Sequence, residues 1–470
     1  MPRRPAASGR RRIVPHPSVE ERVARGKAAR SAVPRSSHAR FEPASDRRDP
    51  VELLEQQAAT RVADLVPIRY GRMLASPFAF YRGAALIMAA DLATTPVSGV
   101  SVQLCGDAHL SNFGVFASPE RRLVFDLNDF DETLPAPFEW DVKRLVASLL
   151  IAARDNRHRR KQQRAAARAA AEAYRRTMAA AAAMRFLEVW YARIDAEDLL
   201  TELAAREDKA TIKAAHKGLA KARKRTSLGS LSKFAQRVDG GYRIKQQPPV
   251  IVRPPDAGYG DFEQIIRQGL TDYARSLSPE RRLVLDHYHY VDFARKVVGV
   301  GSVGTEAFMV LLMGDRDDDP LFLQVKEADT SVLAPYAGAG EYEQQGERVV
   351  QGQRIMQAAS DPFLGWATGT GARGREVYIR QLRDMKGSAA IEGMPPTRLA
   401  RYGEVCGVTL ARAHARSGDA AKIAGYLGDD DTFDRALEAF AVAYADQNDA
   451  DHAEFTAAAD EQRIAVERGV

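Results

Sequence analysis

The sequence predicts an α+β protein in which long helices flank a separate antiparallel sheet. Residues 142–183 are rich in alanine and arginine and contain no glycine or proline, which favours one or two long helices. Between residues 291 and 325, three apolar stretches alternate with period two and are joined by short glycine-rich or acidic connections. Connections this short suit antiparallel strands, because a parallel crossover needs about a dozen residues or more.

The other elements follow from the same periodicities. We expect helices over residues 51–66, 78–92, 209–225, 341–359 and 399–416, and short strands over residues 100–104, 122–127 and 377–382. Pro67 is expected to close the first of these helices. Residues 1–49 show no apolar periodicity, so they are expected to form a disordered basic arm, with ordered structure beginning near Val51.

These elements divide the chain into four regions. After the arm at 1–49, residues 50–290 are expected to form a helical lobe with a helical insert at 154–255. Residues 291–396 are expected to form a β-rich lobe, and residues 397–470 a set of C-terminal helices that pack on the helical lobe.

The net charge of +6 is unevenly distributed along the chain. Residues 1–50 hold 13 Lys and Arg against 5 Asp and Glu, and two further basic segments lie at 154–176 and 209–225. In the last of these, lysines at 209, 213, 217 and 221 fall on one helical face. Such segments suit solvent or a polyanion, so the arm is expected to make at most weak polyanion contacts.

The compartment follows from cysteine use and hydropathy. The chain has only two cysteines, too few for a disulfide framework. Its longest apolar run is far shorter than the roughly 20 residues needed to span a bilayer. We therefore expect a cytoplasmic protein without membrane contact.

The first motif with chemical potential follows the strand over 100–104 and reads Cys105-Gly106-Asp107-Ala108-His109-Leu110-Ser111-Asn112. Phosphoryl transfer uses an Asp that accepts the proton of the attacking hydroxyl and an Asn that binds Mg²⁺. The core, D-x-H-x-x-N, resembles the catalytic loop of aminoglycoside and choline phosphotransferases, which are small-molecule members of the protein-kinase-like superfamily. A metallophosphoesterase would also need a later Gly-Asn-His block, and the chain has no Gly-Asn dipeptide. The simplest alternative is a polar turn capped by Asp107 and Asn112.

The second motif is an acidic segment with four carboxylates in seven residues, Asp126, Asp129, Asp131 and Glu132. Carboxylates this dense repel one another unless a cation or a basic group is near, which favours a metal. Asp129-Phe130-Asp131 resembles the kinase D-F-G, whose Asp binds Mg²⁺. Asp129 is therefore the preferred ligand, whereas the spacing from Asn112 favours Asp126. A solvated acidic turn is the alternative.

The third motif is a glycine loop, Gly299-Val300-Gly301-Ser302-Val303-Gly304, between two predicted strands. A dinucleotide-binding loop leads into a helix, but the residues after this loop alternate as a strand. Strand, glycine loop and strand form the kinase arrangement, in which the loop covers the ATP phosphates. The residues expected to form this cover are Gly299, Gly301, Ser302 and Gly304.

Lys326 ends the strand after the glycine loop and resembles the ATP-binding lysine of kinases. Period-two alternation places it opposite the face formed by Leu321, Leu323 and Val325. The helix over 341–359 offers Glu347, or less readily Glu343, as its ion-pair partner. The alternative is an ordinary hairpin with a surface lysine.

The remaining candidates have more ordinary interpretations. Arg69, Arg72 and Arg82 could bind an anion, but arginines are more often structural or at the surface. His287 and His289 share a strand face without a second ligand pair for a metal. Cys105 is more typical of a small buried residue than of a nucleophile.

The motifs occur in an unusual order, because kinases carry the glycine loop and the lysine before the catalytic loop. A circular permutation with its cut just before the catalytic loop restores the kinase order. Consistent with this, the helix over 399–416 ends in His414-Ala415-Arg416-Ser417-Gly418-Asp419 and resembles the helix that precedes the catalytic loop in kinases. The predicted fold is therefore α+β, protein-kinase-like and two-lobed, circularly permuted, with a large helical lobe.

Several segments resemble an uncharacterised bacterial family, domain of unknown function 2252. They read VPRSSHARF, PIRYGRM, CGDAHLSNFG, NDFDE, FEWDVKRL, QVKEA, YIRQLRDMK and HARSGD. The resemblance covers nearly the whole chain after about Arg30 and implies membership of the kinase-like superfamily, without supplying a substrate. The chain departs from the small-molecule kinases at Cys105, where they carry His.

Together these motifs predict an ATP- and Mg²⁺-dependent phosphotransferase that acts on a hydroxyl, which is expected to belong to a small molecule. Asp107 would be the catalytic base, with Asn112 and Asp129 or Asp126 as metal ligands. Lys326, oriented by Glu347, would hold the phosphates under the glycine loop. The alternatives are a non-catalytic nucleotide-binding protein, an AMP transferase on the same fold, and nucleic-acid binding through the basic segments.

Overall fold

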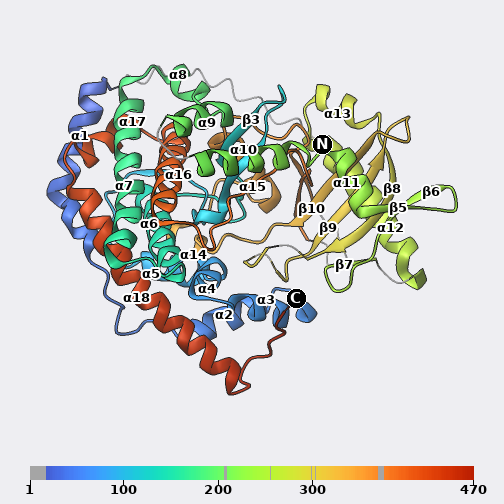
Figure 1. Cartoon of the computed structure of the whole chain (residues 1–470), viewed down its shortest axis with the longest axis horizontal. Helices are drawn as coiled ribbons and strands as arrows, with labels where there is room; N and C mark the ends of the chain where they lie inside the picture. The colour runs from blue at the N-terminus through green and yellow to red at the C-terminus, as the bar shows by residue number, and fades with distance from the viewer. Residues whose placement is uncertain are drawn as a thin grey trace, which may run out of the picture.

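The computed structural model describes residues 17–205, 209–253, 256–297, 299–301, 303–368 and 375–469. A lobe of long helices and a lobe built on a sheet lie side by side (Figure 1). The prediction of an α+β protein is confirmed. Within the described ranges, no helix combines the length and the apolar character that crossing a bilayer requires.

Four long helices form the core of the helical lobe: α6 (Phe138–Asp155), α7 (Arg160–Ala183), α16 (Pro396–Ser417) and α18 (Thr432–Asp460). α6 is buried along nearly its whole length. α7 and α16 approach closely because both present small residues, and a Cβ on Gly407 would lie 2.4 Å from the carbonyl oxygen of Ala170. α17 (Ala420–Leu427) and α8 (Phe186–Tyr191) pack against this bundle.

The sheet lobe contains a six-stranded antiparallel sheet of order β11-β12-β10-β9-β8-β7. Its strands are β7 (Ile251–Val252), β8 (His289–Lys296), β9 (Ala307–Met313), β10 (Pro320–Glu327), β11 (Gly365–Ala367) and β12 (Val377–Gln381). Helices α12 (Asp256–Ser276) and α13 (Pro279–Leu285) cover one face, and α11 (Ser227–Phe234) with the hairpin β5 (Ala235–Val238) and β6 (Gly241–Ile244) covers the other. α15 (Gln345–Met356) packs on β11, β12 and α16, so it joins the lobes.

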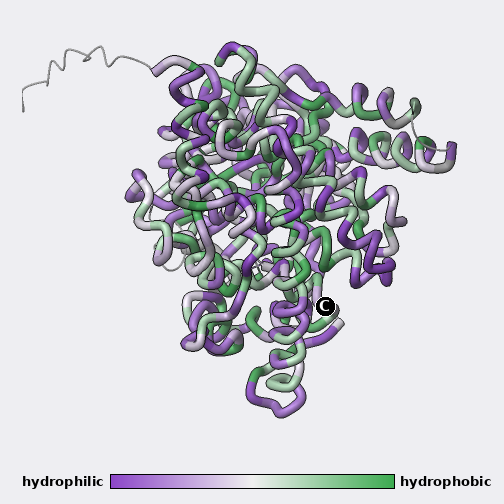
Figure 2. Tube along the Cα trace, turned by 90° about the vertical axis from the view of Figure 1, so that its left-hand side faces the viewer, coloured by the Kyte–Doolittle hydropathy of each residue, from purple (hydrophilic) through white to green (hydrophobic). Residues whose placement is uncertain are grey.

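Shorter elements carry the motifs between the two lobes. Two small two-stranded antiparallel sheets pair β1 (Ser101–Leu104) with β4 (Leu134–Pro137) and β2 (Phe113–Ala117) with β3 (Leu123–Leu127). The remaining helices are α2 (Pro50–Ala58), α3 (Val66–Met73), α4 (Pro77–Gly83), α5 (Ala85–Leu92), α9 (Ala196–Ala204), α10 (Lys209–Arg223) and α14 (Ala334–Ala337). Along the outer helices hydrophilic and hydrophobic residues alternate, as expected for helices with one packed face (Figure 2).

The segment predicted as a disordered arm contains an ordered helix, α1 (Val19–Ala32), so the prediction is wrong for residues 17–49; residues 1–16 lie outside the described part of the chain. Ser18 and Glu21 cap α1 reciprocally. The helix packs on α17 through backbone, and Arg30 donates to the carbonyl oxygens of Tyr426 (2.9 Å) and Gly425 (2.6 Å). Because this contact uses backbone atoms and an arginine rather than a row of apolar side chains, it leaves no apolar periodicity in the sequence.

Several predicted boundaries also differ from the structure. Pro67 lies in the first turn of α3 rather than after a helix, a position where its missing N–H costs no hydrogen bond. The expected helix over 78–92 is broken at Ala84 into α4 and α5. α11, α12 and α13 pack on the sheet, although they lie within residues 50–290, and α7 belongs to the bundle core rather than to an insert.

The basic segment over residues 154–176 has acidic partners on and beside α18. On α7, Arg175 pairs with Asp434 of α18 at 2.8 Å, and Arg168 pairs with Asp431. Arg154, at the end of α6, pairs with Asp446 at 2.7 Å. The lysines at 209, 213, 217 and 221 on α10 remain exposed. Four arginines of residues 154–176, Arg154, Arg164, Arg168 and Arg175, therefore pair with carboxylates of α18 or with Asp431 just before it.

The docking of α1 can be tested by paired Gly→Ala substitutions. A Cβ on Gly26 would lie 2.0 Å from the carbonyl oxygen of Lys422, whereas a Cβ on Gly218 in α10 would have no neighbouring atom within 4 Å. Gly26→Ala should lower the free energy of unfolding by about 1–3 kcal/mol, and Gly218→Ala should raise it by up to about 1 kcal/mol. Urea denaturation measures both. Equal stability of Gly26→Ala and the wild type would contradict the docking of α1.

Candidate active site

A single cavity of about 580 Å³ brings together residues from motifs that are far apart in the sequence. The loop after β1, the acidic segment after β3 and the glycine loop between β8 and β9 each form one wall, and residues 48–61 with α4 and α5 form the fourth. Residues 327–336, at and just after the end of β10, complete the lining. Among the predicted site residues, those that line it are Asp107, Asn112, Asp129, Gly299 and Gly301.

The loop over residues 105–112 is anchored by a buried carboxylate of α6. Asp141 accepts hydrogen bonds from the backbone N–H groups of Cys105 (2.8 Å) and Gly106 (3.1 Å), and it lies 3.3 Å from Nε2 of His414. Gly106 has φ of +84°, and a Cβ there would lie 2.2 Å from the carbonyl oxygen of Glu132. A glycine is therefore required where the loop meets the acidic segment.

Asp107 is positioned by the side chains of Arg144 and His109. Nε of Arg144 donates to Oδ1 of Asp107 at 2.8 Å, and Nε2 of His109 lies 3.7 Å from Oδ2. Nδ1 of His109 accepts the N–H of Ser111, so the ring proton lies on Nε2, which faces Asp107. Burial lowers the pKa of His109 to about 3, although the charge of Asp107 acts to raise it. The imidazole ring is therefore neutral.

Asn112 closes the same loop from its other end. Its amide nitrogen donates to the backbone carbonyl of Asp107 at 2.7 Å. Both residues line the cavity, so the carboxylate of Asp107 and the amide of Asn112 face the same space.

Lys326 is buried beneath the acidic segment and is not among the residues that line the cavity. Its ammonium pairs with Asp131 and lies 3.7 Å from Oδ1 of Asp129. Tyr378 donates to the other oxygen of Asp131 at 2.7 Å. Burial raises the pKa of Asp129, and Asp131 raises it further. Burial alone would also raise the pKa of Asp131, but Lys326 and the two hydrogen bonds lower it overall.

Neither predicted glutamate partners Lys326. Glu347 lies in the first turn of α15, where its N–H donates to the side chain of Gln344, and Glu343 is exposed. The side chain that α15 sends to the acidic segment is Arg348, which donates to the carbonyl oxygens of Asp131 (2.9 Å) and Thr133 (2.7 Å). The prediction of a Lys326–Glu347 pair is therefore wrong. In the sequence, the dense carboxylates around Asp131 were the signal that could have identified the partner of Lys326.

Of the two candidate metal ligands, only Asp129 reaches the cavity. Asp126 lies in β3 and accepts hydrogen bonds from the N–H groups of Leu127 (2.9 Å) and Ala358 (3.0 Å). Burial raises its pKa, and Arg416 opposes this effect. In the described ranges, no three His, Cys, Asp or Glu side chains are grouped as a metal site. Asp129 and Asn112 offer oxygen ligands that suit Mg²⁺, which usually binds through one or two protein oxygens together with phosphate and water.

The glycine loop is fastened to residues 61–72. Gly299 and Gly304 have φ of +72° and +94°, and Ser302 lies outside the described residues. Arg72 donates to the carbonyl oxygen of Gly299 at 2.5 Å, and the N–H of Val62 donates to that of Gly304 at 2.8 Å. Arg72 is therefore structural, as is Arg69, which is fully buried and donates to the carbonyl oxygen of Gly83.

Sequence reasoning underestimated Arg82, which lines the cavity together with Arg48 and Arg61. Arg82 lies in the last turn of α4, one residue before its end at Gly83, and its backbone carbonyl oxygen would lie 2.9 Å from a Cβ on Gly301. A lone arginine in a helical stretch carries no signal for such a role. Only the approach of the glycine loop to α4 reveals it.

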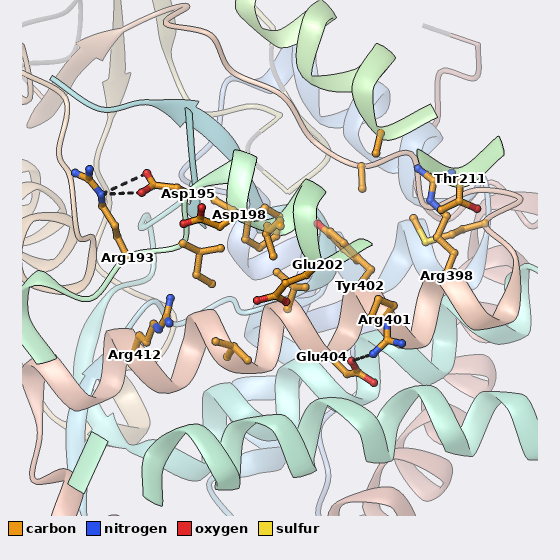
Figure 3. A pocket seen from close by; sticks show the side chains of 18 residues that line it. Arg193, Asp195, Asp198, Glu202, Thr211, Arg398, Arg401, Tyr402, Glu404 and Arg412 are labelled. Atoms are coloured by element: carbon orange, nitrogen blue, oxygen red, sulfur yellow. Dashed lines mark hydrogen bonds and ion pairs between the residues drawn. The ribbon is translucent and has the colours of Figure 1, made fainter. Parts of the chain in front are cut away.

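A second cavity of about 440 Å³ lies between β3, α9, α10 and α16 (Figure 3). Its charged residues partly neutralise one another, since Arg193 lies 3.3 Å from Asp195 and Arg401 lies 2.6 Å from Glu404. No predicted site residue lines it. The chemistry that the motifs suggest therefore concentrates in the first cavity.

Glu132 gives the acidic segment a pH-dependent stability. Burial raises its pKa to about 7, against the hydrogen bond from the N–H of Val332 and the charge of Arg348. The folded chain thus binds this proton more tightly than the unfolded chain. The stability it contributes is present at acidic pH and is lost as the pH rises through about 7.

Glu132→Gln tests this assignment. From about pH 5 to about pH 8, the wild type should lose about 1–3 kcal/mol of unfolding free energy that the Gln variant does not lose. Urea denaturation at several pH values measures the difference. Identical pH dependence of the two proteins would contradict it.

Most of the chain, residues 61–458, matches one family model, which is described as an uncharacterized protein conserved in bacteria (DUF2252). Searches of curated proteins and of solved structures find no match. The matched span includes both lobes and nearly all of the cavity. The chain therefore belongs to the family named domain of unknown function 2252.

Proposed function

We propose that this protein is an ATP- and Mg²⁺-dependent phosphotransferase with a circularly permuted, kinase-like fold. The observation that carries the proposal is the meeting of the D-x-H-x-x-N loop, the acidic segment and the glycine loop at one cavity. These motifs are separated by many residues in the sequence, and unrelated turns have no reason to converge.

The path of the chain supports the permutation. The end of α16 lies beside β1, the strand that leads into the loop over 105–112. Oγ of Ser417 accepts the N–H of Gln103 at 3.1 Å, and a Cβ on Gly418 would lie 2.5 Å from the side chain of Val102. A chain that continued from α16 into β1 would follow the kinase order. In that order, the residues before β1 and the residues after α16 would be additions to the two ends of the chain.

Each cavity residue has a role that its contacts permit. Asp107, held by Arg144 and His109, would accept the proton of the attacking hydroxyl. Asn112 uses its amide nitrogen within the loop, which leaves its oxygen for a cation shared with Asp129. Bound Mg²⁺ and ATP would supply the transferable phosphate and screen its charge. Lys326 lies behind the acidic segment, so we assign it to positioning Asp129 and Asp131.

The acceptor is proposed to be the hydroxyl of a small molecule. The cavity of about 580 Å³ is enclosed by both lobes and by residues 48–61 and α4–α5, which suits a compact ligand beside a nucleotide. The loop form with His109 two residues after Asp107 is the form that resembles small-molecule kinases.

Asp107→Asn tests the mechanism with little change in shape. ATP turnover on a panel of hydroxyl compounds should fall about 100-fold or more, because the carboxylate can no longer accept a proton. Binding of Mg²⁺–ATP should stay nearly unchanged. Asp317→Asn, on an exposed turn of the sheet lobe, is the matched control.

Turnover and product mass separate the outcomes. Undiminished turnover in Asp107→Asn would overturn the assigned base. Nucleotide binding by the wild type with no turnover on any compound would favour a non-catalytic protein, and a product heavier by AMP would indicate nucleotidyl transfer.

A further inference from the structure

Three arginines, Arg48, Arg61 and Arg82, line the cavity together with the loop that carries Asp107. The other carboxylates in its lining are Asp129, Asp131, Glu132, Glu327 and Asp329. Guanidinium groups and carboxylates therefore share one cavity.

The guanidinium of Arg82 has no anionic partner among the described residues. Its Nε is buried without a hydrogen bond, and the described chain places no carboxylate within 4.0 Å of it. Asp107 is close enough to influence its charge, but Arg144 already occupies Oδ1 of that carboxylate at 2.8 Å. Burial lowers the pKa of Arg82, which reflects a cation without full compensation.

Arg61 is in a similar state. Its Nε is also buried without a hydrogen bond, and its one hydrogen bond within the described chain goes to the carbonyl oxygen of Val303 at 2.6 Å. Burial lowers its pKa as well, against the charges of Glu132, Asp329 and Asp131, none of which lies within 4.0 Å of it. Arg61 and Arg82 reach the cavity from separate elements, so their coincidence there is not a product of one helix face.

Other arginines inside the protein have their charge compensated by carboxylates. Arg47 pairs with Asp91 and Asp451, both at 2.7 Å, and Arg175 pairs with Asp434 at 2.8 Å. A desolvated guanidinium without such a partner is costly to the folded state. Arg61 and Arg82 have no such partner among the described residues, and both line the cavity that also holds Asp107 and Asn112. Arg69 also has buried side-chain nitrogen atoms without a hydrogen bond, but it does not line this cavity.

We propose that Arg82 and Arg61 form a subsite for a phosphate-type oxyanion in this cavity. The identity of the ligand rests on the proposed function: the oxyanion belongs either to the phosphate chain of the nucleotide or to an anionic group on the acceptor. In both cases it lies in the cavity that also holds Asn112 and Asp129. The guanidinium groups supply paired N–H donors and charge to it.

The side chain of Arg82 can be changed without disturbing the glycine loop, because its contact with Gly301 is made by the backbone carbonyl. The test is isothermal titration of the full-length protein with pyrophosphate in the absence of Mg²⁺. Arg82→Gln and Arg61→Gln should each weaken binding about tenfold or more. Arg82→Lys should retain part of the affinity, because lysine keeps the positive charge but lacks the paired N–H donors of the guanidinium group. Arg237→Gln, which alters an exposed arginine in the sheet lobe, should bind like the wild type.

Parallel titrations with Mg²⁺–ATP and with adenosine identify the source of the oxyanion. Loss of Mg²⁺–ATP affinity in step with pyrophosphate, with adenosine binding unchanged, assigns the subsite to the nucleotide phosphates. Loss of pyrophosphate affinity alone assigns it to the acceptor.

The subsite and the transfer reaction can fail separately. Asp107→Asn should still bind pyrophosphate, so a protein without transfer activity can still show the subsite. Equal pyrophosphate affinity of the wild type, Arg82→Gln and Arg82→Lys would overturn the subsite, as would a wild type that binds no pyrophosphate. Neither of these results would bear on the proton acceptor.

Discussion

The ion pair between Lys326 and Asp131 is the interaction on which the geometry of the cavity depends. Lys326 comes from the sheet lobe and Asp131 from the segment between β3 and β4 on the helical side. Tyr378, Arg348 and Arg380 of the sheet lobe also bond to residues 128–133. Without these contacts, the carboxylates of the acidic segment would repel one another in a poorly solvated space. The lysine therefore fixes the acidic segment and, with it, the distance between the lobes.

The loop over 105–112 is held in place by a buried helix rather than by an ion pair between the lobes. α6 holds the loop over 105–112 through Asp141 and Arg144, and both side chains are buried. A helix buried along nearly its whole length is a rigid support, so Asp107 and Asn112 are held by packing as well as by charge. The glycine loop is fastened in turn to residues 61–72. Three walls of one cavity are thus each fixed by their own contacts.

Periodicity and composition predicted the main strands and helices of both lobes. The strands β8, β9 and β10 and the helix α16 follow the apolar periodicity, whereas the alanine-rich composition of residues 142–183 predicted α6 and α7. Lys326 lies on the face of β10 opposite Leu321, Leu323 and Val325 as expected, although β9 and β10 are buried on both faces. α1 escaped prediction because its contact with α17 is made by glycine and by arginine–carbonyl hydrogen bonds. Neither leaves a hydrophobic pattern.

The candidate site was predictable where a motif supplies both residue type and spacing, as for Asp107, Asn112, Asp129 and the glycines. Pairings across the fold were not, because they depend on which residue of a helix turns towards the cavity. In α15 that residue is Arg348 and not its neighbour Glu347. Arg82 was hidden for the same reason, since only the tertiary fold brings α4 to the glycine loop.

The central claim is that the two lobes together bind a metal–nucleotide complex between Asn112 and Asp129. Anomalous scattering from crystals grown with Mn²⁺ and a non-hydrolysable ATP analogue measures this directly. We predict a manganese peak at coordination distance from the carboxylate of Asp129 and the amide oxygen of Asn112, with the nucleotide phosphates completing the coordination. Manganese and nucleotide bound outside this cavity, or a cavity that stays empty at saturating analogue, would contradict the account.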